Sequence, residues 1–96
     1  MPIQVAAHGF DLTPSLKDCC TLETQERLSP LAQHGMSAKW VLSVEKGEHI
    51  AHINWNDGSY HGDATVKTED MYSSIKQAVK KAAEQLKRAH EKKYNH

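Results

Sequence analysis

The sequence lacks the long hydrophobic runs that would cross a membrane. No stretch of about eighteen consecutive apolar residues occurs among its 96 residues, so we expect no transmembrane helix. The opening segment, Met1–Val5, lacks the basic and apolar regions of a signal peptide, and we therefore expect a cytoplasmic protein. The length predicts a single domain, residues 1–96, with one modest hydrophobic core.

Cysteine and glycine are both scarce. The two cysteines, Cys19 and Cys20, are neighbours, and neighbouring cysteines seldom form a disulfide because the bond would strain the intervening peptide. We expect two free thiols in a reducing compartment, one in the core and one partly exposed. The five glycines form no cluster that could hold a phosphate, and no nucleophile elbow or zinc-protease motif is present. These absences predict a protein that is not an enzyme and uses no cofactor.

The seven histidines are the obvious candidates for metal ligands. His49 and His52 are three residues apart in a predicted strand, so they point to opposite faces of the sheet and are poor co-ligands. His52 and His61 can be neighbours on the polar face of a hairpin, with Asp63 as the obvious third ligand. Solvated strand histidines explain the same pattern more simply, and we predict no metal site.

Alternating apolar residues predict four strands. These strands cover residues 3–8, 37–45, 49–55 and 60–67. The last three share one apolar face, which consists of Ala38, Trp40, Leu42, Val44, Ala51, Ile53, Trp55, Tyr60, Gly62, Ala64 and Val66. The dipeptide Asp57-Gly58 predicts a tight hairpin turn between the last two strands.

Two amphipathic helices complete the predicted fold. Thr13 is the expected N-cap of a first helix that runs to about Ala32. Thr68 is the expected N-cap of the second helix, with Glu69 and Asp70 in its first turn. The predicted buried stripe of this helix is Tyr72, Ile75, Val79, Ala82, Ala83, Leu86 and Ala89. The order β-α-β-β-β-α predicts an α+β fold of two layers, a four-stranded sheet with two helices packed on one face.

The formal net charge of zero is an average over two oppositely charged parts. Residues 76–96 carry seven basic and two acidic side chains, whereas residues 1–75 carry five basic and ten acidic ones. A basic helix on an acidic domain favours a polyanionic partner, although lysines also commonly fill solvated helix positions. Because lysine predominates over arginine, we expect contacts with the phosphates of folded RNA rather than base readout. The candidate RNA-binding residues are Lys76, Lys80, Lys81, Lys87, Arg88, Lys92 and Lys93.

The last helix also resembles that of a known family. The segment Asp70-Met71-Tyr72 is followed by Ile75, Lys81, Gln85-Leu86, Arg88, His90 and Lys92. This pattern is similar to the C-terminal helix of the ribosome hibernation promoting factor family, also called ribosome-associated inhibitor or sigma-54 modulation protein. Ile3-Gln4-Val5, Leu12-Thr13 and Val41–Lys46 resemble its first strand, helix cap and second strand. The chain ends soon after the helix, as in the short form of the family.

The resemblance implies a translation regulator that binds the small ribosomal subunit and its rRNA. Such a factor would occupy the mRNA and tRNA channel and inactivate ribosomes in stationary phase or stress. Lys81, Arg88 and Lys92 are the first residues it implies as phosphate contacts. It also implies a second small hibernation factor as a further partner, and we expect a monomer away from the ribosome.

Two alternatives stay open. A double-stranded RNA-binding domain has an overlapping order of elements, but it carries a basic patch at the start of its last helix, where this chain has Glu69 and Asp70. A protein-binding adaptor of the same fold is favoured by the acidic residues of the first helix.

Overall fold

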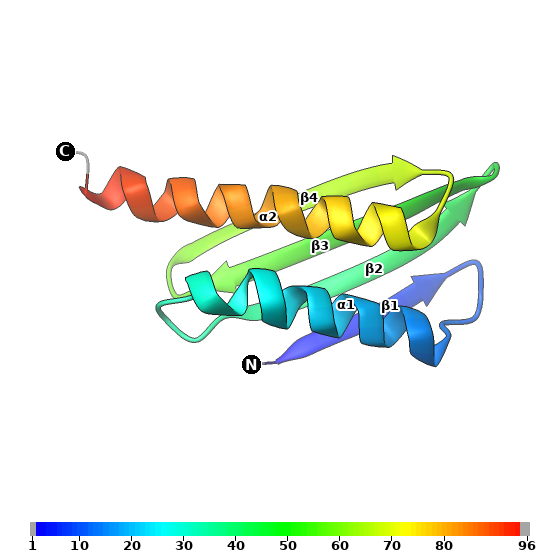
Figure 1. The fold of residues 1–96 in the computed structure, drawn as a ribbon, viewed down its shortest axis with the longest axis horizontal. Coiled ribbons are helices and arrows are strands. Elements are labelled where there is room, and N and C mark those ends of the chain that lie inside the picture. Colours follow the sequence, from blue (N-terminus) through cyan, green and yellow to red (C-terminus); the bar gives the residue numbers. More distant parts are fainter. Residues whose placement is uncertain (1, 95–96) are drawn as a thin grey trace.

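The computed structural model describes residues 2–94, and it describes side chains up to residue 91. The elements are β1 (Ile3–His8), α1 (Pro14–Arg27), the 3-10 turn η1 (Ser29–Leu31), β2 (Ser37–Glu45), β3 (Glu48–Asp57), β4 (Tyr60–Thr68) and α2 (Met71–Tyr94). The strands lie in the order β1-β2-β3-β4, with β1 parallel to β2 and the other pairs antiparallel. Figure 1 shows both helices on one face of this sheet, so the predicted two-layer α+β fold is confirmed.

The core lies between the helices and the apolar face of the sheet. Trp40 and Trp55, on neighbouring strands, are both fully buried there. The register pairs Trp40 with Ile53 and Trp55 with Gly62, which places the predicted inward residues of the three strands side by side. The predicted apolar face is therefore confirmed. Within the described part of the chain, neither helix is long and apolar enough to cross a membrane.

The first helix is shorter than predicted. It ends at Arg27 rather than near Ala32, and the chain then tightens into η1. Pro30 explains the difference, because proline has no N–H to donate to the preceding helical turn. Cys20 is fully buried and Cys19 half-buried, and both are free thiols, as the sequence predicts.

The beginning of the second helix also differs from the prediction. Asp70, not Thr68, is the cap, since its Oδ2 accepts a hydrogen bond of 3.0 Å from the backbone N–H of Ser73. Thr68 instead exchanges hydrogen bonds with the backbone of Asp70, which fixes the turn before the helix. Met71 takes the buried position expected for Tyr72, whose side chain is 41% exposed.

Candidate nucleic-acid interface

Gln85 attaches α2 to the edge of the sheet. Its Oε1 accepts a hydrogen bond of 2.9 Å from Trp55 Nε1, and its Nε2 donates one of 2.6 Å to the backbone carbonyl of Asp63. Gly62 leaves the space for this contact, because a Cβ there would lie 2.7 Å from Trp55 Cζ2 and 2.9 Å from Gln85 Oε1. These two hydrogen bonds thus fix the position and the rotation of α2 over β3 and β4.

Asp57 provides a second attachment, which lies five residues further along α2 than Gln85, at His90. Its fully buried carboxylate accepts hydrogen bonds from the backbone N–H groups of Gln33 and His34, and it lies 3.1 Å from His90 Nε2. Burial alone would raise the pKa of Asp57, but these hydrogen bonds outweigh it and hold the pKa below its ordinary value. The sequence predicts only a turn role for Asp57, because nothing local reveals that three distant donors converge on it.

The β4 side of α2 carries two of the candidate RNA-binding residues. Lys81 and Arg88 lie four residues before and three residues after Gln85, so all three project from the same side of the helix. Lys81 and Arg88 are exposed beside β4, which is an edge strand of the sheet. We call this pair the β4-side cations.

The opposite side of α2 faces α1. Lys76 lines a groove between the two helices, and Lys80 and Lys87 follow on the same side of α2 at helical spacing. All three side chains are exposed. The structure therefore divides the basic residues between two edges of the helix. The side chains of the remaining predicted residues, Lys92 and Lys93, lie outside the described residues.

None of the five described cations of α2 is neutralised by an ion pair within the described residues. The ion pairs there join Arg27 to Glu23 and His90 to Asp57. The five charges are thus free to meet phosphate groups. The suggested histidine pair does not form across the hairpin, because His52 pairs with Thr65, and His61 lies opposite Asn56.

Comparisons with known proteins agree on one family. The family model described as sigma 54 modulation protein / S30EA ribosomal protein matches residues 3–94. Two curated relatives named ribosome hibernation promoting factor, from Klebsiella oxytoca and Salmonella typhimurium, are each 30% identical over the full length of both chains.

Solved structures share the fold. The N-terminal domain of Thermus thermophilus Protein Y has a TM-score of 0.84 at 24% identity, over 92% of this chain and 98% of that chain. A ribosomal subunit interface protein from Coxiella burnetii has a TM-score of 0.81 at 19% identity, over 94% of this chain and 98% of that chain.

Proposed function

The chain belongs to the sigma 54 modulation protein / S30EA ribosomal protein family, and from this membership we propose that it is a ribosome hibernation factor. It binds the small ribosomal subunit in the mRNA and tRNA channel and inactivates ribosomes in stationary phase or stress. The observation that carries this proposal is the match of the whole chain to relatives named for that role. It acts in the cytoplasm, without catalysis, and is a monomer away from the ribosome.

The β4-side cations make the first contacts with rRNA in this proposal. Lys81 and Arg88 are exposed, unpaired within the described residues, and held on a helix that Gln85 fixes to the sheet. Because the backbone of the helix is already fixed, binding has only the side chains to order, so these cations contribute more than cations on a mobile segment would. Lys92 extends this side by one helical turn in the sequence, and Lys93 follows it.

The cations that face α1 contribute less in this proposal. Lys76 shares its groove with carboxylates of Asp18, Glu23 and Glu26 on α1. These negative charges repel phosphate and offset part of the attraction of Lys76, Lys80 and Lys87. A second small hibernation factor is a further partner in this proposal.

Sedimentation with purified ribosomes tests the proposal. The variant Lys81→Glu/Arg88→Glu should lose ribosome association, because both β4-side cations become repulsive toward phosphate. The matched control is Lys39→Glu/Lys67→Glu, which reverses two exposed lysines on the open face of the sheet. The control should sediment with ribosomes like the unchanged protein, and both variants should keep its thermal unfolding temperature.

Retained association of the Lys81→Glu/Arg88→Glu variant would refute the assigned side of the helix. Free duplex RNA is the second ligand to examine. Equal affinity for a short duplex and for the small subunit would favour a general double-stranded RNA-binding protein instead. Absence of association with either ligand at low salt would contradict the proposed function itself.

A further inference from the structure

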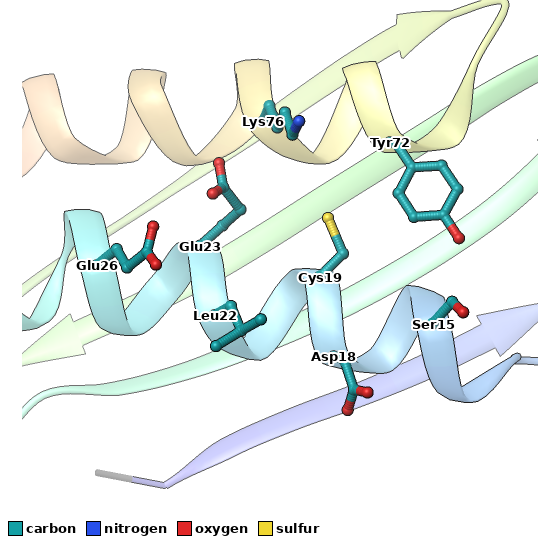
Figure 2. Close-up of a pocket in the computed structure, with 8 residues that line it drawn as sticks. All are labelled: Ser15, Asp18, Cys19, Leu22, Glu23, Glu26, Tyr72 and Lys76. Carbon is teal, nitrogen blue, oxygen red and sulfur yellow. The ribbon is translucent and has the colours of Figure 1, made fainter.

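A groove separates the two helices on the outer surface of the domain. It has a volume of about 440 Å³, and α1 supplies most of its lining, with Tyr72 and Lys76 contributed by α2. Figure 2 shows Cys19 and Glu23 pointing from α1 toward α2, and the ring of Tyr72 pointing toward α1. Its lining follows α1 from Ser15 to Glu26, which suits an extended or helical segment better than a small molecule.

The exposed large hydrophobic side chains of the described residues gather in this groove. Leu22 is 53% exposed and Tyr72 is 41% exposed, and both line it. They come from different helices and line the same groove. The half-buried Cys19 lies between them in the lining. Exposed apolar side chains that line one groove, with polar residues beside them, are typical of a binding surface.

The charged side chains in the lining of the groove are mainly negative. Asp18, Glu23 and Glu26 line the α1 side of the groove, and Lys76 is the cation in the lining. Glu23 is paired with Arg27 at 3.3 Å, whereas Asp18 and Glu26 have no ion-pair partner within the described residues. The two unpaired carboxylates are exposed and would attract positive charge while repelling phosphate.

The groove continues into a more apolar recess where both helices begin. The recess has a volume of about 400 Å³ and shares Tyr72 with the groove. Phe10, Leu16, Val44 and Met71 supply most of its other apolar lining. Figure 1 shows that α1 and α2 start at the same end of the sheet, which places this recess beyond the end of the groove. A large apolar side chain of a ligand can occupy it.

We propose that the groove between α1 and α2 binds a cationic amphipathic segment of a protein partner. The apolar side of the segment covers Leu22 and Tyr72, and its lysine or arginine side chains meet Asp18 and Glu26. Charge complementarity selects this occupant, since an RNA strand would meet the same carboxylates with its phosphates. The surface is separate from the β4-side cations, so the domain can hold RNA and a basic protein segment at once.

Chemical-shift mapping by NMR tests the proposal with a defined probe. The probe is a synthetic helical peptide with leucines spaced to form one apolar side and lysines flanking them. A matched peptide carries glutamate in place of each lysine. The lysine peptide should shift the backbone amide signals of α1 and of Tyr72, and the glutamate peptide should leave them unchanged.

Variants then assign the contacts. Asp18→Lys/Glu26→Lys should weaken binding of the lysine peptide by about tenfold or more, and Leu22→Ser should weaken it as well. Asp18, Leu22 and Glu26 are all exposed, so their replacement should preserve the fold. Thermal unfolding checks this expectation. The control Glu45→Lys/Glu48→Lys reverses two exposed acids in the β2–β3 hairpin and should bind the peptide as before.

Three outcomes would overturn the proposal. Equal binding of the glutamate peptide would show that charge does not select the ligand. Chemical-shift changes confined to another surface would show that the groove is not the binding site. Shifts of the groove signals with protein concentration alone would identify a second copy of this chain as the occupant. Loss of ribosome association by the Lys81→Glu/Arg88→Glu variant is independent of all three, so the two proposals can fail separately.

Discussion

His90 Nε2 lies 3.1 Å from Oδ2 of the fully buried carboxylate of Asp57. The low pKa of Asp57 keeps this carboxylate ionised, so the Nε2 atom of His90 carries the hydrogen of the bond. The bond attaches the later part of α2, close in sequence to Arg88, to the turn end of the β3–β4 hairpin. The position of the basic helix therefore depends on a buried acid that itself never reaches the surface.

Replacing Asp57 by asparagine should lower the free energy of unfolding by about 2–3 kcal/mol. The amide would lose the charge that strengthens three hydrogen bonds, and its NH2 group would face an N–H donor. Denaturant unfolding measures the effect. The exposed Asp63→Asn is the control and should change stability little.

The same carboxylate should make stability depend on pH in the acid range. Because the folded pKa of Asp57 lies below its ordinary value of 3.8, its contribution is complete above that value and is lost as pH falls through the folded pKa. Unfolding measured across this range should show a shallower acid decline for Asp57→Asn than for the unchanged chain. Parallel pH profiles would show that Asp57 is not the group responsible.

Gly62→Ala should destabilise the domain by about 1–3 kcal/mol, because the added methyl group overlaps the Trp55 ring and the Gln85 amide. Thermal unfolding should show the loss. Lys67→Ala on the exposed side of the same strand is the control and should behave like the parent. An unchanged unfolding temperature for Gly62→Ala would mean that the contact between Gln85 and Trp55 can be broken without loss of stability.

The two adjacent cysteines should react at very different rates. Burial, reinforced by the neighbouring Cys19, raises the pKa of Cys20 to about 12, and its side chain is inaccessible. A thiol reagent at mild alkaline pH should therefore modify one thiol in the folded protein and two after denaturation. Cys19→Ser should abolish the reaction of the folded protein, and modification of Cys20 in that variant would contradict the buried assignment.

The affinity for ribosomes should fall with salt concentration, and the steepness of this fall should report the number of phosphate contacts. Removing the β4-side cations in Lys81→Ala/Arg88→Ala should reduce the slope of log affinity against log salt concentration by about 2. Lys39→Ala/Lys67→Ala should leave the slope unchanged. Equal slopes for both variants would place the phosphate contacts elsewhere on the protein.

Local patterns in the sequence were enough to predict much of this fold. The alternation in Ala38, Trp40, Leu42 and Val44 predicts a strand with one buried side, and the register confirms that side. The predicted cap of α1, Thr13, is confirmed, whereas the predicted cap of α2 was wrong because two side chains compete for that position. Asp70 and Thr68 can both cap a helix, and only the path of the chain selects Asp70.

The sequence by itself determined the order of elements, the buried side of each strand and the basic character of α2, because each depends on neighbouring residues in the chain. Tertiary structure decided which residues meet across the fold. How α1 and α2 pack on one sheet decides which edge of α2 lies beside β4 and which lies beside α1. The same packing brings carboxylates of α1 into the groove that Lys76 lines, and it makes Leu22 and Tyr72 part of one lining. Contacts between segments far apart in the chain leave no periodic pattern, so only the packed structure reveals them.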